Sequence, residues 1–541
     1  MGQSADMLPA QFLPPLGPSP KVLMVWPRVE PSFWGFDGML ELLPSDSLHP
    51  PLGLATVAAL CPAAWTVRLV DLNLDPLTDA DLAWADLVMV GGMNVQDEGM
   101  RTALARARAL GKRSMVGGPY VSAGPEQWQS LADHVVVGEP DEMFSEIARD
   151  VERGTAQPRY DVVEKPDIRK SPTPRFELLE YRRYASMSVQ VSRGCPYTCE
   201  FCDIITIYGR RPRIKPPSQV VAELDRLYAL GWRGRVNIAS DNFVADHRQA
   251  LELAIELQSW QQAHGYPFQL SGEASMDLAQ RPQLIAAMVK ANFWGVFIGI
   301  ESPSREALTE TRKLQNLRQD PLEALRQIRG AGLWITGGFI VGFDSDTGDI
   351  FQRQHEFITR AAITWAMTGF LIALPTTPLH KRLEAEGRLV RRSRSNANFK
   401  PPNFQTVLPL AELLRGGQSL LRSLYEPDGF YDRGFRSIDE WGISPDQRVP
   451  KQSASFMLGV LLRSLVQQGL RSSYRTAYWR FLLKVLRSWR RNPVKLRQGI
   501  TVLISGHHFI RYAESVVEDL EREIGRLAAD PTDATAREVA A

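Results

Sequence analysis

The chain has 541 residues, a length that favours two or three domains. Its composition, 44% hydrophobic and 23% charged, is ordinary for a soluble globular protein. Four cysteines in such a length exclude a disulfide scaffold and indicate a reducing compartment. The net charge of +2 conceals a basic stretch, because residues 447–513 contain no Asp or Glu while Lys and Arg recur there.

The sequence carries no export or membrane-spanning signal. Residues 1–20, MGQSADMLPAQFLPPLGPSP, lack the basic start and apolar core of a signal peptide. No apolar run reaches the roughly 18 residues that a membrane-spanning helix needs. We therefore expect a cytoplasmic protein with an N-terminal extension over residues 1–20.

From residue 21 to residue 153, short apolar runs alternate with helical patterns. The runs end in Gly, Asn or Pro, as strands often do, and they read KVLMVWP, WTVRLVDLN, DLVMVGGM, KRSMVGGPY and DHVVVGE. Segments such as PLGLATVAALC and EGMRTALARARALG lie between them with helical spacing. This alternation predicts a doubly wound, Rossmann-like parallel sheet in an α/β domain.

Two glycine-containing segments follow strands of this sheet. Open parallel sheets bind ligands at the carboxyl ends of their strands, and glycine lets a backbone approach a ligand closely. We therefore expect a ligand site made by Gly91, Gly92, Met93, Gly117, Gly118 and Pro119. The alternative is that these glycines only form tight turns.

The second half of the chain repeats the strand–helix alternation. Residues 154–186 form a linker rich in proline and charge. Over residues 187–375 the strand-like runs are MSVQVS, GRVNIAS, FQLSGEAS, WGVFIGIES, LWITGGFIVGF and MTGFLIALP. These repeats predict a partial (β/α)6 barrel with its site at the carboxyl ends of the strands. Residues 376–541 form a mostly helical C-terminal domain that contains the basic amphipathic segment.

Three of the four cysteines directly follow the first barrel strand. Cys195, Cys199 and Cys202 have the spacing CxxxCxxC, and no second cysteine pair completes a four-ligand zinc site. Thiolates hold iron–sulfur clusters, and a four-iron cube with three protein ligands keeps one iron open. The spacing therefore predicts a 4Fe-4S cluster with an open position for chemistry.

This motif resembles the signature of the radical S-adenosylmethionine (SAM) superfamily, CxxxCxΦC with an aromatic residue before the last cysteine. The resemblance implies that the open iron binds SAM and that reductive cleavage produces a 5′-deoxyadenosyl radical, which abstracts hydrogen from the substrate. It also implies the residues that contact SAM at the strand ends: Phe201, Ser240, Asp241, Asn242, Glu273, Glu301, Gly338 and Ile340.

A doubly wound domain ahead of such a barrel resembles the cobalamin-binding radical SAM enzymes, in which the glycine segments would contact cobalamin. The familiar DxHxxG motif, whose histidine ligates cobalt, is absent, because DLNLD (residues 71–75) follows the second strand. Members of this class without the histidine hold cobalamin with no protein imidazole on the metal. The resemblance therefore implies cobalamin without histidine ligation, and a vestigial domain that binds nothing is the alternative.

More closely, CDIITIYGRRPRIKPPSQVVAELDRLYALGWRG, SDNF, GEAS and FIGIES look like the hopanoid C-2 methylase group. That resemblance implies a methyltransferase that uses one SAM as methyl donor and another as radical source. It acts on an unactivated carbon of a hydrophobic substrate, such as a hopanoid at C-2, bound between the two cofactors across the domain boundary. The alternatives are a cyclase or rearrangement enzyme without methyl transfer, and a non-catalytic iron–sulfur sensor.

The expected partners are a lipid-like small molecule and an external electron donor such as flavodoxin or ferredoxin, with no nucleic acid. SYRTAYWRFLLKVLRSWRRN mixes cations with aromatic residues at helical spacing, which is typical of helices that bind anionic membrane surfaces. The alternative is that the same helices pack their aromatic residues against the barrel.

Overall fold

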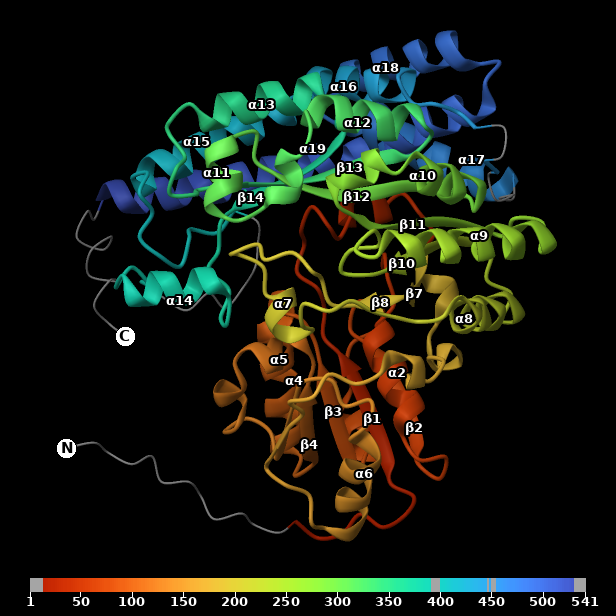
Figure 1. Cartoon of the computed structure of the whole chain (residues 1–541), viewed down its shortest axis with the longest axis vertical. Coiled ribbons are helices and arrows are strands. Elements are labelled where there is room, and N and C mark those ends of the chain that lie inside the picture. Colours follow the sequence, from red (N-terminus) through yellow and green to blue (C-terminus); the bar gives the residue numbers. More distant parts are fainter. Residues whose placement is uncertain (1–12, 391–398, 445–446, 449–453, 530–541) are drawn as a thin grey trace. The chain divides into compact units, whose positions relative to one another are not determined.

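In a computed structural model the chain divides into two compact units, and the structure describes residues 13–390, 399–444, 447–448 and 454–529 (Figure 1). Unit 1 comprises residues 1–29 and 51–180, and unit 2 comprises residues 30–50 and 181–541. Of the predicted N-terminal extension, residues 1–12 lie outside the described ranges.

Unit 1 is a six-stranded parallel sheet in the order β2-β1-β3-β4-β5-β6. Its strands are β1 (Lys21–Trp26), β2 (Thr66–Asp71), β3 (Leu87–Gly91), β4 (Arg113–Gly117), β5 (His134–Val137) and β6 (Arg159–Asp161). Its α-helices are α2 (Leu52–Leu60), α3 (Asp79–Trp84), α4 (Asp97–Ala109), α5 (Pro119–Ala123) and α6 (Phe144–Arg153). The strand order reverses between β1 and β3, which is the ligand-binding switch point of doubly wound sheets.

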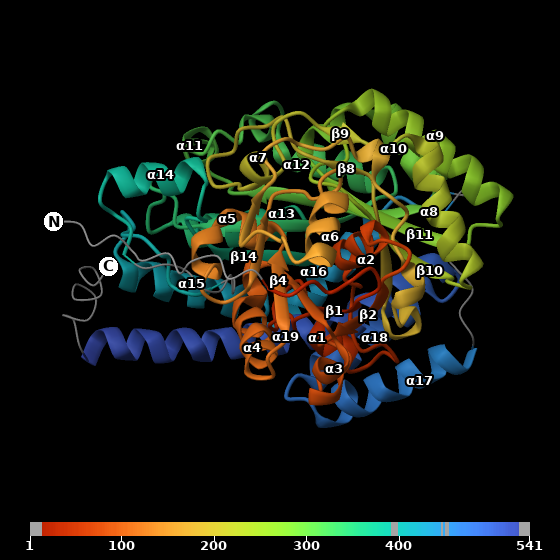
Figure 2. The ribbon, with the colours of Figure 1, turned by 90° about the horizontal axis from the view of Figure 1, so that it is seen from below.

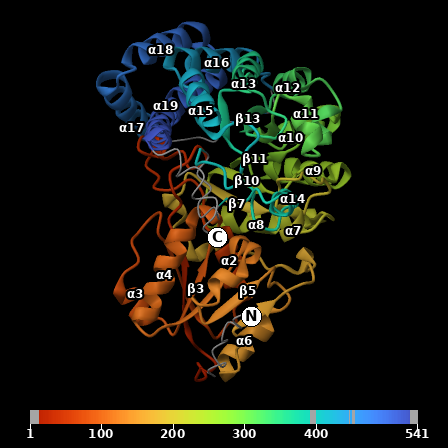
Figure 3. The same cartoon turned by 90° about the vertical axis from the view of Figure 1, so that its left-hand side faces the viewer.

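Helices cover both faces of this sheet, as the continuous apolar runs of its strands require. In β1, Leu23 and Val25 pack into one core with residues of α4, whereas Val22 and Met24 pack into a second core with residues of α6. Figure 3 shows α4 and α6 on opposite sides of the strands. The structure therefore confirms the doubly wound fold.

Unit 2 contains a second six-stranded parallel sheet, in the order β14-β13-β12-β11-β10-β7. Its strands are β7 (Ser186–Gln190), β10 (Gly234–Ala239), β11 (Phe268–Ala274), β12 (Phe293–Glu301), β13 (Trp334–Val341) and β14 (Trp365–Phe370). The helices between them are α7 (Ile204–Ile207), α8 (Pro217–Ala229), α9 (His247–Ala263), α10 (Pro282–Lys290), α11 (Arg305–Glu310), α12 (Pro321–Gly330) and α13 (Ile350–Arg360), and β8 (Ser192–Arg193) pairs with β9 (Arg213–Ile214). This arrangement confirms the partial (β/α)6 barrel.

A helical region completes unit 2. It comprises α14 (Pro378–Ala385), α15 (Leu410–Leu424), α16 (Pro427–Asp439), α17 (Ala454–Ser464), the π-helical segment η8 (Leu465–Arg471), α18 (Arg475–Trp489) and α19 (Pro493–Ala529). Helix α19 packs against α15, α16 and α18, and against α1 (Asp37–Leu40) from the early part of the chain (Figure 2). Within the described residues, no helix has the length and apolar character needed to cross a bilayer.

Candidate active site

The three predicted cluster ligands lie on one loop, residues 194–203, between β8 and α7. Gly194 has a φ of +95°, and a Cβ there would lie 2.8 Å from the carbonyl oxygen of Arg211. The Cys195 amide donates a hydrogen bond to the carbonyl oxygen of Gly209 at 3.2 Å. The loop therefore folds tightly against residues 209–211, and glycine at position 194 permits this approach.

The cysteine thiols are free, and their surroundings fit a cluster. Burial raises the pKa of Cys195, and it raises the pKa of Cys202 to about 12. Such thiols are protonated near neutral pH, so a metal must displace the protons as it binds. Among the residues that the structure describes, no three His, Cys, Asp or Glu side chains form a single-ion site. Each thiolate of a four-iron cube binds a different iron, and three free cysteines on one loop fit that requirement.

Segments from elsewhere in unit 2 hold the cysteine loop in place. Asp241, at the end of β10, accepts a hydrogen bond from the Gly194 amide through Oδ2 at 2.6 Å. The Glu200 amide donates to the carbonyl oxygen of Thr311 at 2.9 Å, and the Glu200 carbonyl oxygen accepts from the Leu379 amide at 3.0 Å. The loop is thereby fixed to strand β10, to the end of α11 and to the start of α14.

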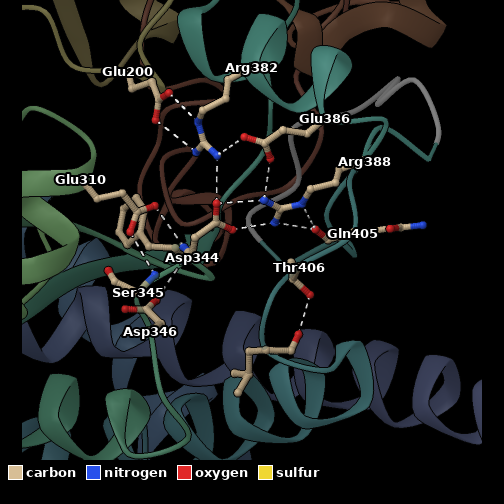
Figure 4. Close-up of polar contacts among 12 residues, drawn as sticks. Glu200, Glu310, Asp344, Ser345, Asp346, Arg382, Glu386, Arg388, Gln405 and Thr406 are labelled. Carbon is tan, nitrogen blue, oxygen red and sulfur yellow. Dashed lines mark hydrogen bonds and ion pairs between the residues drawn. The ribbon is translucent and has the colours of Figure 1, made fainter.

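An ion-pair network also joins the loop to the residues that follow the barrel (Figure 4). Arg382 of α14 donates to both carboxylate oxygens of Glu200, at 2.8 and 3.3 Å, and to Asp344 at 2.9 Å. Arg388 contacts Asp344 at 2.6 Å, and Glu386 accepts from both arginines. Burial opposes ionisation of Asp344, but its bonds to the two arginines outweigh burial and lower its pKa. Asp344 is therefore a fixed anion between two cations.

Lys313, which no sequence motif predicts, lies beside the cysteine loop. Its ammonium group donates to Glu301 at 2.6 Å and lies 5.8 Å from the centre of the Phe201 ring. Burial opposes the charge, but Glu301 and the nearby Cys199 sulfur outweigh burial and raise the pKa of Lys313. Gln315 lies 3.6 Å from the Cys199 sulfur through Nε2. Both residues stand in RKLQN, whose sequence has no motif that would mark them.

The predicted SAM residues at the ends of β10 and β11 are hydrogen-bonded to one another. Glu273 accepts from the Asn237 side chain at 3.2 Å and from the Ser240 amide at 3.3 Å. Burial raises the pKa of Glu273 to about 6, although these hydrogen bonds partly offset the shift. Asn242 is buried and donates to Ser275 at 3.0 Å, so its side chain has a structural partner.

The predicted SAM residues Phe201, Ile340 and Gly338 do not all pack in the same part of the barrel. Phe201 and Ile340 pack against one apolar cluster, and the Phe201 ring lies 6.2 Å from that of Phe343. Gly338 instead packs against the Phe297 ring on the neighbouring strand, where a Cβ would lie 2.7 Å from Cζ. Glu301 has a φ of +68°, an uncommon value for a non-glycine residue, and its carboxylate is paired with Lys313.

In unit 1 the structure brings the two predicted glycine segments together. Gly91 and Gly117 are register partners at the carboxyl ends of β3 and β4. Gly118 has a φ of +105°, and a Cβ there would lie 3.4 Å from the carbonyl oxygen of Gly92. Pro119 begins α5, and Met93 is 42% exposed. The six positions therefore line one edge of the sheet, beside its switch point.

His134 is the one histidine in the sequence of unit 1, and it lies on β5, the strand next to β4. It is the first residue of β5, whereas Gly91 and Gly117 are the last residues of their strands. Its Nδ1 lies 2.8 Å from the carbonyl oxygen of Gln157, and burial lowers its pKa. His134 is therefore level with Met115 in the middle of β4, two residues before Gly117, and its ring is bonded to the backbone of residue 157.

Family models match three successive parts of the chain: a B12 binding domain over residues 42–148, the Radical SAM superfamily over residues 189–358 and a domain of unknown function, DUF4070, over residues 377–522. An uncharacterised methyltransferase of Synechocystis sp. is 38% identical over 93% of this chain and 94% of its own length. The hopanoid C-2 methylase of Rhodopseudomonas palustris is 35% identical over 92% of this chain and 94% of its own length. The chain belongs to the cobalamin-binding radical SAM methyltransferases.

A solved structure agrees with this family at the level of fold. The cobalamin-dependent radical SAM enzyme OxsB, with aqua-cobalamin bound, aligns with a TM-score of 0.57 over 94% of this methyltransferase and 81% of its own chain, at 14% identity. The cofactors of the methyltransferase are a 4Fe-4S cluster, SAM and cobalamin. The side chains that contact SAM and cobalamin remain predictions, and they rest on the positions of these residues at the strand ends.

Proposed function

We propose that this methyltransferase methylates a hopanoid at C-2 of its ring system. The observation that carries the proposal is the similarity to the hopanoid C-2 methylase of R. palustris, which extends over 92% of this chain at 35% identity. The match includes both cofactor domains and the helical region, so it covers the parts that would select a substrate as well as the chemical machinery.

When bound, the cluster, SAM and cobalamin supply the radical and the methyl group. The protein contributes binding, orientation and exclusion of water. In our proposal Glu273 accepts hydrogen bonds from polar atoms of SAM, and Glu301 holds the Lys313 ammonium group beside the cysteine loop. Burial of these groups strengthens their electrostatic effect, because they lie in a low-dielectric surrounding. An external reductant, such as flavodoxin or ferredoxin, supplies the electrons.

A lipid analysis tests the proposed substrate. We expect deletion of the gene to abolish 2-methylhopanoids in the source organism and to leave the unmethylated hopanoids. Complementation with the intact gene should restore them, and complementation with the Cys199→Ala variant should not. Unchanged 2-methylhopanoids in the deletion strain would contradict the substrate. A lost product with an unaltered number of carbon atoms would favour a cyclase or rearrangement enzyme.

We also propose that the helical region binds the cytoplasmic face of an anionic membrane. One face of α17 and η8 exposes apolar side chains at helical spacing, Leu458, Leu462, Val466 and Leu470. On α18, Trp479, Leu483 and Leu486 are exposed among cations, while the opposite face of the helix is buried. A helix with this mixture can insert its apolar face between headgroups while its cations meet anionic lipids.

Two cations of α18 already have acidic partners. Arg480 lies 2.9 Å from Asp428, and Lys484 lies 2.9 Å from Asp432, both on α16. Arg475, Arg487, Arg490 and Arg491 are exposed on the same helix or directly after it. Each cation near an anionic surface contributes on the order of 1 kcal/mol, so several together hold a protein there reversibly.

Liposome co-sedimentation tests this surface. We expect binding to anionic vesicles at low salt, weaker binding at high salt and none to neutral vesicles. A quadruple variant with Gln at Arg475, Arg487, Arg490 and Arg491 should lose binding. The control variant Arg480→Gln/Lys484→Gln should lose less, because Asp428 and Asp432 already neutralise those cations. Equal losses in the two variants, or no binding by the unaltered protein, would contradict the membrane role.

A further inference from the structure

Residues 30–50 lie between the two sequence segments of unit 1, yet they belong to unit 2 and are hydrogen-bonded to it. The Phe33 carbonyl oxygen lies 3.3 Å from His508 Nε2 of α19, and Arg463 of α17 donates to the Leu42 carbonyl oxygen at 3.0 Å. Asp46 pairs with Arg183 at 2.6 Å. Gly38 packs so closely on α19 that a Cβ would lie 2.8 Å from the His508 Cα. The segment is therefore an integral part of unit 2.

The conformation of Phe36 shows how firmly this segment is held. Its φ of +53° is a left-handed value that a bulky side chain adopts only when its surroundings compel it. The ring packs against Trp365 of β14 at 5.7 Å and against His508 and Phe509 of α19 at 5.5 and 5.4 Å. Strain of this kind concentrates at functional sites.

The segment lines one side of a cavity of about 160 Å³ inside the barrel. Trp34, Phe36, Met39 and Leu48 face side chains of the barrel strands, among them Phe297, and the Trp34 and Phe297 ring centres are 4.5 Å apart. His49 also lines the cavity, and burial lowers its pKa to about 4, so its ring is neutral. These walls offer a mostly aromatic and aliphatic surface, with Arg235 and Glu273 as its two charged side chains.

This inner cavity reaches the predicted SAM residues. Glu273 and Asn237, which are hydrogen-bonded to each other, form part of its wall. Phe297 also lines it, and the same ring packs against Gly338. A molecule in the cavity therefore lies beside residues that we expect to contact SAM.

A second, outer cavity of about 530 Å³ adjoins the first. The two cavities share Met39, Leu48 and Arg235 as lining residues, so these three side chains stand at their boundary. The outer cavity is lined further by apolar side chains of α17 and α19, namely Phe456, Met457, Val460, Ile500 and Ile504, and by the cations Arg182, Arg233 and Arg497. Met457 is 37% exposed and adjoins the apolar exposed face of α17. Together the cavities have a volume typical of ligand pockets, about 300–1,000 Å³.

We propose that the inner cavity binds the reacting end of a rigid polycyclic hydrocarbon, that the outer cavity is its entry path from the α17 surface, and that residues 30–50 determine which substrates fit. The proposal rests on the proposed function. It narrows the substrate class to molecules that are long and apolar enough to occupy both cavities. Trp34 and Phe36 set the shape of the inner cavity, and Met39 and Leu48 set the width of the passage.

The variant Met39→Trp tests the passage in the holoenzyme. A larger side chain at the boundary should lower the rate of methylated product by roughly tenfold or more, mainly through a higher KM for the lipid, because overpacked sites reject their occupant. The matched control is Leu40→Trp, in the same helical turn but outside both cavity linings. Cluster absorbance and the unfolding temperature show whether each variant is folded. Methylation by Met39→Trp at the rate of the unaltered enzyme would overturn the proposal.

Photolabelling with a diazirine-bearing sterol separates this proposal from the choice of hopanoid. The probe is a rigid polycyclic hydrocarbon, so we expect it to label peptides containing residues 34–49 or 294–297, and the Met39→Trp variant to lose that label. Labelling confined to the outer face of α17 and α18 would overturn the cavity assignment. If the cavity is labelled but no hopanoid is methylated, the proposed substrate fails and the cavity assignment stands.

Discussion

At the scale of single residues, Glu273 connects the architecture of the barrel to a measurable pH dependence. The pKa of about 6 arises because the carboxylate is buried at the end of β11, and its hydrogen bonds offset the effect of burial only in part. In the protein without ligands, the pKa of Glu273 is raised from its ordinary value of 4.5 to about 6, so the folded state binds this proton more tightly than the unfolded chain. The contribution of Glu273 to stability therefore falls as pH rises through this range.

Binding of SAM should show the opposite pH preference. SAM carries a positive charge, which favours the ionised form of Glu273, so its affinity should fall as the pH drops below about 6. The Glu273→Gln variant keeps the shape of the side chain but cannot ionise. We expect it to bind SAM more weakly at pH 8, with a flatter pH profile. Anaerobic calorimetry across this range provides the measurement, and identical profiles for the two proteins would contradict the role of Glu273.

Gly118 tests the cobalamin prediction at the same scale. Alanine there would have to adopt a φ of +105° beside the Gly92 backbone, at a cost of about 1–3 kcal/mol. The control is Gly111→Ala, which has a φ of +63° but no atom within 4 Å of the added Cβ. We expect both variants to unfold at lower temperature and only Gly118→Ala to lose cobalamin on gel filtration. Equal cobalamin retention would contradict a site at these glycines.

At the scale of elements, the ion pairs of Figure 4 give the cysteine loop a support that lies outside the barrel. Arg382 on α14 reaches Glu200, which stands between two of the cysteines. Arg382 is partly exposed, so its ion pairs contribute modestly, about 1 kcal/mol. Their consequence is positional, because they hold the Glu200 carboxylate against Arg382 of α14.

We therefore expect the Arg382→Gln variant to release iron faster than the unaltered protein when a chelator is added to the reconstituted enzyme. The control is Arg388→Gln, because Arg388 contacts Asp344 and Glu386 but not Glu200. Both variants should lose a similar, small amount of stability, and only Arg382→Gln should change the rate of iron release. Identical release rates in the two variants would show that the network stabilises the fold without supporting the loop.

The sequence predicted the strands and helices well where the spacing of apolar residues and the local composition determine them. The apolar runs of β1, β3 and β4 are buried on both faces, and each barrel strand stands where its run was identified. The roles of Lys313 and residues 30–50 were not predicted from the sequence, because these roles depend on contacts with distant parts of the chain. The Lys313–Glu301 pair and the packing of Phe36 on α19 arise only after the barrel has closed around them.

At the scale of the whole molecule, the order of the domains along the chain indicates radical methyl-transfer chemistry. A B12 binding domain precedes a radical SAM barrel, and a helical region with an exposed basic and apolar face follows. The doubly wound sheet and the partial barrel were both recognisable from the sequence, because strand–helix alternation is a repeated pattern. The amphipathic character of α17 and α18 was predictable from the helical period of the sequence. Which face of each helix a neighbouring helix covers was not predictable, because that depends on tertiary packing.

The most direct test of the central claim follows the methyl group. Reconstituted enzyme is incubated anaerobically with a strong reductant, SAM deuterated at the methyl group and unmethylated hopanoid. We predict a hopanoid carrying the deuterated methyl group, together with 5′-deoxyadenosine and S-adenosylhomocysteine. Cys199→Ala should form neither lipid product nor 5′-deoxyadenosine, whereas Cys61→Ala, altered at a half-buried thiol of unit 1, should form both. A lipid without the label despite 5′-deoxyadenosine formation, or full activity in Cys199→Ala, would contradict the account.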